Sequence, residues 1–197
     1  MFKRRYWVII VLILGGGAAF LAYNSGGNEP TVDWQKKYPQ LSNNAGYGKL
    51  AASVPAYQAK TASQQELIGK VTNEFGIRDD VLKLILNTIP ESNVRATIAA
   101  VKLAQYNQAE VGLTDDMEIN ALENKAAAAI SCLKFGSMQD EAKFIDHYAD
   151  MIRDTPARKA EQNRIEHLLS NHVISDDYGI QSYDPKEQCD HFLGVNS

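Results

Sequence analysis

The N-terminus constrains this chain most, because three basic residues precede a long apolar run. Lys3-Arg4-Arg5 is followed by the stretch from Tyr6 to Tyr23, which contains no charged side chain. As a helix, this stretch would rise about 27 Å at 1.5 Å per residue, close to the roughly 30 Å hydrocarbon core of a bilayer. We therefore expect residues 1–23 to be a signal-anchor or transmembrane segment that crosses the lipid bilayer through residues 6–23.

The residues around the apolar run predict its orientation. Tyr6 and Trp7 lie at one end and Tyr23 at the other, where amphipathic rings favour the headgroup layers. The basic residues come first and no acidic residue precedes Glu29, so the positive-inside rule keeps the N-terminus in the cytoplasm. We expect a single-pass inner-membrane protein whose domain faces the periplasm.

A cleaved signal peptide is the alternative interpretation of the same stretch. A basic start, the seven apolar residues 8–14, and small residues at Gly17 and Ala19 all fit that pattern. Three consecutive glycines, residues 15–17, also suit a cleavage region, because each weakens helix propensity by up to about 1 kcal/mol. We favour the uncleaved anchor because the apolar run continues through residues 20–23. A cleaved chain would be a soluble periplasmic protein, so both interpretations place the domain outside the cytoplasm.

Charge and cysteine content narrow the possible partners and the redox environment. Beyond residue 23 the chain has 17 Lys and Arg against 24 Asp and Glu, a net charge of −7 that disfavours nucleic acid and anionic lipid as partners. The two cysteines, Cys132 and Cys189, predict one disulfide in an oxidising compartment, with two buried free thiols as the alternative. Closing this loop of about 57 residues would contribute about 4 kcal/mol in the loop-entropy model.

The remaining sequence predicts a stalk and one helical domain. Residues 24–62 contain frequent Gly and Pro, although aromatic residues such as Trp34 and Tyr47 indicate that part of this stalk lies across the domain. Residues 63–197 are expected to form an all-α domain of about five to six short antiparallel helices. Its C-terminal tail should fold back so that Cys189 reaches Cys132.

Capping residues and apolar spacing define the expected helices. A capping box at Ser63 and Glu66 predicts a helix that continues through Phe75 to Gly76. Asp79-Asp80 then opens a short, almost wholly apolar helix that ends at Pro90, and such a helix is expected at the centre of the domain.

Four further helices are expected after Pro90. Ser92 is expected to cap one that runs to about Val111, and Thr114 to cap the next. Ser137 is expected to cap a fifth helix, and Thr155-Pro156 to open a sixth. The core-facing stripe expected for the fourth helix is Ile119, Leu122, Ala126, Ala129, Ile130 and Leu133, and that for the fifth is Met138, Ala142, Ile145, Ala149 and Ile152.

The histidines give no complete site, and we predict no metal or cofactor. His147 and Asp150 share a helix face and are interpreted as a surface pair. His167 and His172 lie roughly 140° apart around a helix and cannot bind one ion from one face, and His172 is interpreted as a core residue. The cluster Cys189-Asp190-His191 lacks the four ligands with paired spacings that zinc sites usually need.

One pair of dipeptides resembles a catalytic arrangement without matching it. Glu91-Ser92 followed by Tyr106-Asn107 has the residue types of the catalytic pairs of lytic transglycosylases. Only about 15 residues separate the two pairs, and no Gly-Leu-Met-Gln-like segment lies between them. We therefore assign no family and predict no catalytic residue.

Together these features favour a non-catalytic protein-interaction module of the cell envelope, such as a subunit or adaptor of an envelope assembly. A periplasmic immunity or inhibitor protein that binds an envelope-active toxin is the first alternative. A cell-envelope enzyme is the second. Each of these hypotheses implies a binding partner or substrate in the cell envelope.

Overall fold

The computed structural model describes residues 61–170, Cys189 and residues 192–193. The described residues form no strand, so this part of the chain is all-α, as predicted. Its helices are α5 (Ala62–Ile68), α6 (Asp79–Thr88), α7 (Val94–Glu110), α8 (Asp116–Ser131), α9 (Met138–Ile152) and α10 (Pro156–Leu169). The expected membrane segment and nearly all of the expected stalk lie outside the described residues. No helix within the described part has the length and apolar character needed to span a membrane.

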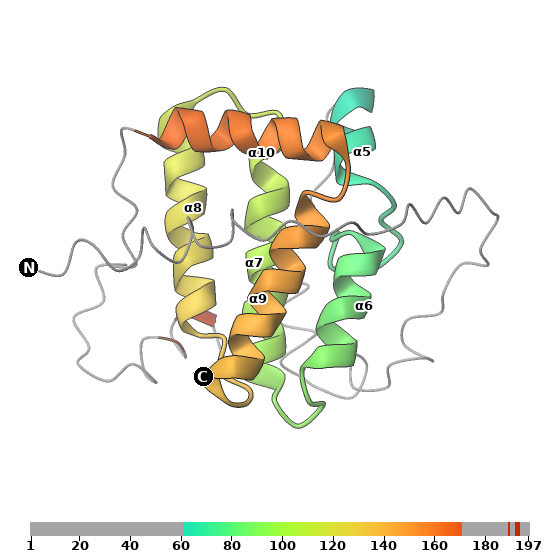
Figure 1. Ribbon diagram of the computed structural model, residues 1–197, viewed down its shortest axis with the longest axis vertical. Coiled ribbons are helices and arrows are strands. Elements are labelled where there is room, and N and C mark those ends of the chain that lie inside the picture. Colours follow the sequence, from blue (N-terminus) through green and yellow to red (C-terminus); the bar gives the residue numbers. More distant parts are fainter. Residues whose placement is uncertain (1–60, 171–188, 190–191, 194–197) are drawn as a thin grey trace, which may run out of the picture.

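Helices α6 to α9 run alternately up and down, whereas α10 lies across one end of α7 and α8 (Figure 1). The antiparallel arrangement expected for successive helices is therefore wrong for α10. Only residues 153–155 connect α9 to α10, and Thr155 has an extended backbone with φ −119° and ψ 155°. The α10 residues Ile165 and Leu169 pack with Ile119 of α8 in a second, smaller apolar cluster, which fixes the new direction.

The central helix is α7, not α6 as the sequence predicts. Every residue from Ala96 to Gln105 is buried, whereas α6 leaves Asn87 and Thr88 exposed. Alanine side chains let neighbouring helices approach α7 on several sides. The polar residues Thr97, Lys102 and Gln105 are buried among them. Because these polar residues interrupt the apolar pattern, the sequence of α7 does not look like that of a central helix.

The first described helix is shorter than expected and begins with a different capping box. Thr61 and Gln64 cap α5, rather than Ser63 and Glu66. The helix ends at Gly69, whose φ of 87° is a conformation that side-chain-bearing residues rarely adopt. The segment expected to continue the helix to Gly76 is therefore a loop. Phe75 belongs to this loop, and its side chain is buried in the core.

Capping was predicted with mixed success in the later helices. Ser137 caps α9 and Thr155 caps α10, with Pro156 in the first turn, as predicted. The caps of α7 and α8 lie one residue later than expected, at Asn93 and Asp115. Ser, Thr, Asn and Asp all cap well, so neighbouring residues of these types compete and the three-dimensional path of the chain selects one.

The apolar stripe predicted for α9 is only partly correct: Ile145 and Ile152 pack, partly buried, against the core. Phe144 and Tyr148 are the buried residues of α9, whereas Met138 is 86 % exposed and Ala142 is also exposed. The aromatic rings decide the buried face, because they remove more apolar area from water than the smaller side chains do. Ile130, predicted to face the core from α8, is also exposed.

The predicted disulfide joins the end of α8 to the C-terminal segment. Cys132 and Cys189 are bonded, with their Cα atoms 5.4 Å apart. Beyond Cys189, Leu193 is buried in the main core. Lys102 Nζ donates a hydrogen bond to the Phe192 carbonyl at 3.1 Å and lies 5.3 Å from the centroid of the Phe192 ring.

Candidate functional site

A small pocket with a mixed apolar and polar lining lies where α5, α6, α7, α9 and α10 meet. Its volume of about 50 Å³ is enough for a few water molecules, since one water needs roughly 10–15 Å³ on the same measure. Apolar side chains such as Ile68 and Val81 form part of the wall. The polar lining residues are Arg78, Asn107, Gln108, Tyr148, Arg158, Glu161 and Gln162.

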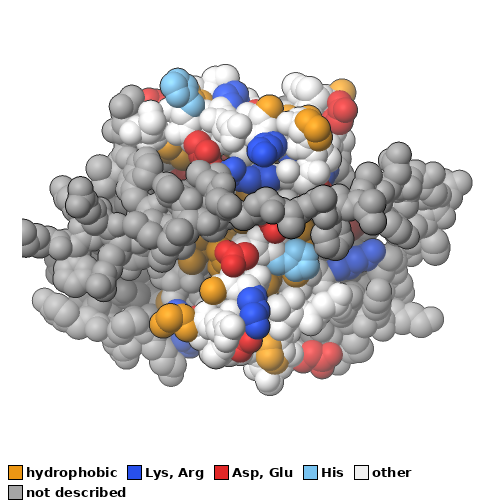
Figure 2. All heavy atoms as spheres, viewed as in Figure 1, with side chains coloured by type: hydrophobic (Ala, Val, Ile, Leu, Met, Phe, Trp, Pro, Cys, Tyr) orange, Lys and Arg blue, Asp and Glu red, His pale blue; other side chains and the backbone are white. Residues whose placement is uncertain are grey.

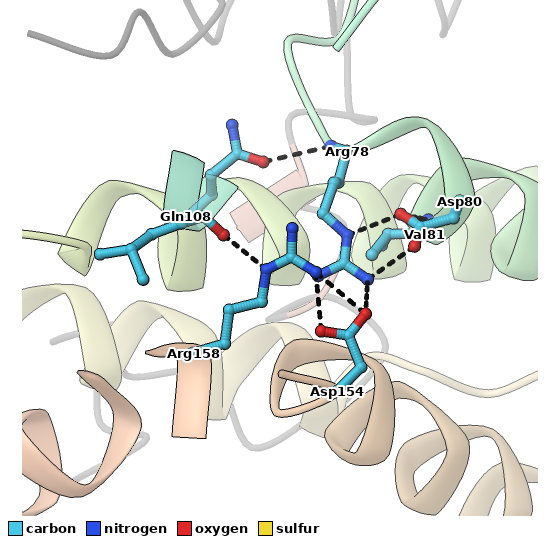
Figure 3. Close-up of polar contacts among 7 residues, drawn as sticks. Arg78, Asp80, Val81, Gln108, Asp154 and Arg158 are labelled. Atoms are coloured by element: carbon cyan, nitrogen blue, oxygen red, sulfur yellow. Dashed lines mark hydrogen bonds and ion pairs between the residues drawn. The ribbon is translucent and has the colours of Figure 1, made fainter. Parts of the chain in front are cut away.

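Arg78 is the buried cation of this pocket (Figure 3). Its Nε and Nη2 atoms donate to the two carboxylate oxygens of Asp80, each at 2.6 Å. Nη2 also donates to Asp154 at 3.1 Å. A bidentate Arg–carboxylate pair fixes the plane of the guanidinium as well as its position, so Arg78 is held rigidly between α6 and the end of α9.

Arg158 forms the second half of the same network. Its Nη1 donates to both oxygens of Asp154, at 2.7 and 2.9 Å, and its Nε donates to the Leu67 carbonyl at 2.6 Å. Asp154 therefore lies between two guanidinium groups, as Figure 3 shows. This carboxylate links α10 to the start of α6, and Arg158 itself links α10 to the last turn of α5 through the Leu67 carbonyl.

The ion pair outweighs the cost of burying its charges. Burial acts to lower the pKa of Arg78, but the hydrogen bonds and charges of Asp80 and Asp154 raise it above its usual value. Burial likewise acts to raise the pKa of Asp80, and the Arg78 guanidinium lowers it overall. Both groups are therefore charged at neutral pH, and the described network has balanced charge: two guanidinium groups with two carboxylates.

The loop of residues 69–78 is held by side chains of α7. Gln108 Nε2 donates to the Gly76 carbonyl at 2.6 Å, and Gln108 Oε1 accepts from the Arg78 backbone amide at 3.1 Å. Gln105 Nε2 donates to the Phe75 carbonyl at 2.8 Å. These three bonds replace the hydrogen bonds that a continuous helix would have made, and they set the position of the Arg78 backbone.

The loop is also held by the start of α6. The carboxylate of Asp79 accepts hydrogen bonds from the backbone amide and the hydroxyl of Thr72, at 2.8 and 2.9 Å, and from the Asn73 amide at 3.0 Å. Asp79, predicted to open a helix, therefore also fastens the preceding loop. Asp80, its neighbour, pairs with Arg78 instead.

The α7–α9 side of the pocket is formed by Asn107 and Tyr148. The Tyr148 hydroxyl donates to Asn107 Oδ1 at 2.8 Å. Burial raises the pKa of Tyr148 well above its usual value, so the phenol keeps its proton. This wall therefore offers neutral hydrogen-bonding groups, whereas the α6–α10 side carries the paired charges.

The structure does not gather the residues that the sequence singled out. His147, Asp150 and His167 are exposed, and His172, Asp190 and His191 lie outside the described residues. Within the described part of the chain, no group of three or more His, Cys, Asp or Glu side chains is arranged to hold a metal ion. Neither His147 nor His167 lines the pocket.

Glu91 and Ser92 are likewise separated from Tyr106 and Asn107. The first pair is exposed in the turn before α7, whereas the second lies near the other end of that helix. Twelve residues from Val94 to Tyr106 correspond to about 18 Å of helix rise. Asn107 is a pocket residue, but its structural partner is Tyr148, not Glu91.

None of the charged residues of the pocket network was predicted as a site residue from the sequence. Asp154 and Arg158 are four residues apart in a loop and the following helix, which indicates only a local ion pair. Their link to Arg78 spans 76 residues of sequence and has no periodic signal. The one available hint was an arginine directly before the Asp79-Asp80 pair.

No family model, curated protein or solved structure matches this chain. The described residues define it as an all-α domain with a disulfide between a helix end and the C-terminal segment.

Proposed function

We propose that the chain is a membrane-anchored helical interaction module that faces the periplasm and serves as a non-catalytic subunit or adaptor of an envelope assembly. The observation that carries this proposal is the Cys132–Cys189 disulfide. Disulfides persist in oxidising compartments and are rare in the cytosol. The basic residues and apolar run at residues 3–23 supply a signal for export to such a compartment.

Exposed apolar side chains support a protein as the partner. Among the described residues, Met117, Ile130 and Met138 are the large apolar side chains exposed to solvent, at 64 %, 43 % and 86 %. Ile130 and Met138 flank the connection between α8 and α9, and flexible methionine thioethers adapt well to a partner surface. Acidic and basic side chains are interspersed over α9 and α10 in Figure 2, a mixed surface that suits a protein partner better than nucleic acid.

Crosslinked membranes expressing the full chain provide the test for a partner. Affinity capture should recover a specific envelope protein, and Met138→Lys should reduce its recovery severalfold. Ala160→Lys adds the same charge at an exposed position on α10 and should leave recovery unchanged. Equal recovery with both variants would contradict the role of this surface. Recovery of an envelope-active toxin would assign the immunity role instead.

Topology and catalysis are tested on the same full chain. A reporter fused after Ser197 should be active only outside the cytoplasm, and cytoplasmic activity would overturn the proposed location. Comparing the size of the mature chain with a version that starts at Phe20 separates a retained anchor from a cleaved one.

Glu91→Gln and His147→Ala should fold and function normally, because both side chains are exposed. A folded variant without biological activity would favour the cell-envelope enzyme.

A further inference from the structure

Glu110 is a carboxyl group buried inside the helical core. It is the last residue of α7 and its side chain is only 1 % exposed. Neither of its oxygens has a hydrogen-bond donor in full bonding geometry. The groups beside it are the amide of Asn107 and the carboxyl of Glu123, which comes from α8. Two carboxyl groups therefore meet at the α7–α8 interface.

Such a pair cannot carry two negative charges without a large cost. A buried carboxylate without donors loses its hydration, and a second carboxylate next to it adds repulsion. Burial first, and the charge of Glu123 second, raise the pKa of Glu110 to about 10. Burial also raises the pKa of Glu123. A proton between the two carboxyl groups satisfies both, because one then donates a hydrogen bond to the other.

The groups that face the pair from the other helices do not supply a positive charge. Tyr148 of α9 donates its hydroxyl proton to Asn107, and its own pKa is raised by burial. Glu166 of α10 repels a charge on Glu123, although Glu166 itself pairs with Arg153. Arg78 acts on Tyr148 and is engaged with Asp80 and Asp154. Among the described residues, neither Glu110 nor Glu123 forms an ion pair.

We propose that Glu110 and Glu123 form a proton-binding site that makes the packing of α7 against α8 pH-sensitive: the pair holds one proton at neutral pH, and loss of that proton loosens the interface. The two helices share the most extensive contact in the described domain. A change at this position therefore affects the whole bundle. A domain facing the cell exterior would then respond to external pH.

The sign of the pH dependence follows from the two states. In the unfolded chain a glutamate loses its proton near its ordinary pKa of about 4.3, whereas the folded pair keeps its proton to much higher pH. Below the unfolded value both states are protonated and the stabilisation is complete. Above it, unfolding releases a proton, so the unfolding equilibrium constant rises about tenfold per pH unit for one proton. Stability is lost as the pH rises toward the folded value.

Urea unfolding of the full chain in detergent, followed by circular dichroism between pH 5 and 8, tests this proposal. The unfolding constant of wild type should rise about tenfold more per pH unit than that of Glu110→Gln, which lacks the titrating carboxyl. Glu123→Gln should reduce the slope by less, because it removes the neighbouring charge but leaves Glu110 buried. Glu118→Gln is the matched control: it lies on the same helix and is exposed, and it should follow wild type.

A direct proton count provides a second measurement. Unfolding at pH 7 in weak buffer, read with a pH indicator, should release one more proton from wild type than from Glu110→Gln. Equal pH slopes and equal proton release in wild type and both glutamine variants would overturn the proposal. A second result would also overturn it: sodium or potassium chloride stabilises wild type more than choline chloride does, while Glu110→Gln shows no such difference. A metal cation would then occupy the place of the proton.

Discussion

At the scale of single residues, Gly69 meets two requirements at one position. Its φ of 87° and ψ of −157° lie in a region that is essentially restricted to glycine. A Cβ atom at this position would lie only 2.6 Å from Nη2 of Arg158. Ending α5 and seating the Arg158 guanidinium against the Leu67 carbonyl therefore both depend on the missing side chain.

Gly69→Ala is expected to lower the free energy of unfolding by roughly 1–3 kcal/mol, the cost of a strained backbone position. Urea denaturation gives the value. Repeating the substitution in an Arg158→Gln background separates the two causes, because the shorter side chain relieves the contact while the backbone strain remains. A Gly69→Ala protein as stable as wild type would contradict this account of the end of α5.

The residue scale is also where prediction from sequence was weakest. Ser63, Ser92 and Thr114 were predicted as caps, yet in each case the structure uses another capping residue one or two positions away. Asp80 and Asp154 belong to a network that only the folded chain brings together. Local sequence does not decide which residue caps a helix or which charges pair, because the alternatives differ in free energy by less than the tertiary contacts contribute.

At the scale of elements, α6 shows how an apolar helix can be placed correctly in sequence and incorrectly in space. Its bounds agree with the expected ones, and Val81, Leu82 and Ile85 are buried. The helix nevertheless packs on one side of α7 and contacts α9, and it does not lie at the centre. Apolar content measures how much surface a helix buries, but it does not measure how many neighbours the helix has.

Ile85→Ala is expected to cost roughly 2–5 kcal/mol, through lost burial and the cavity left behind. Ile85 is fully buried, whereas Thr88 of the same helix is exposed. Thr88→Ala is therefore the control, with an expected change within about 0.5 kcal/mol. The comparison is made by urea denaturation. Similar losses for the two variants would mean that α6 does not bury this face.

At the scale of the whole molecule, the disulfide and the segment after it close the core across α7 and α8. Cys132 is at the C-terminal cap of α8, and Leu193 and Phe192 pack with core residues of the bundle. Phe192 covers Lys102, whose pKa is lowered by burial. The C-terminal segment therefore shields a lysine that would otherwise face water.

Cys189→Ser is expected to lower the free energy of unfolding by about 2–4 kcal/mol and to make the C-terminal segment sensitive to protease. Thermal unfolding with and without reductant provides the measurement. Reductant should lower the Tm of wild type to that of Cys189→Ser and leave the variant unchanged. Ser131→Ala, beside Cys132 and exposed, should behave as wild type. Two titratable thiols in the native, unreduced protein would contradict the disulfide.

The sequence by itself determined the features that depend on local or compositional physics. Periodic apolar residues and strong caps such as Ser137 and Thr155-Pro156 specify helices, because helix formation depends on neighbours three and four residues apart. The even cysteine count, together with the predicted export of the domain, indicated the Cys132–Cys189 bond. These features need no knowledge of how distant segments meet.

Only the tertiary structure decided which helix is central, which face of α9 is buried, and which charges meet. Arg78 and Asp154 are 76 positions apart in the sequence, and Glu110 of α7 lies beside Glu123 of α8; neither pairing has a periodic signature. A buried polar group is recognisable only when its surroundings are known, since the same glutamate is unremarkable on a surface. Long-range packing supplies those surroundings, and it also overrode the local signals that extended α5 to Gly76.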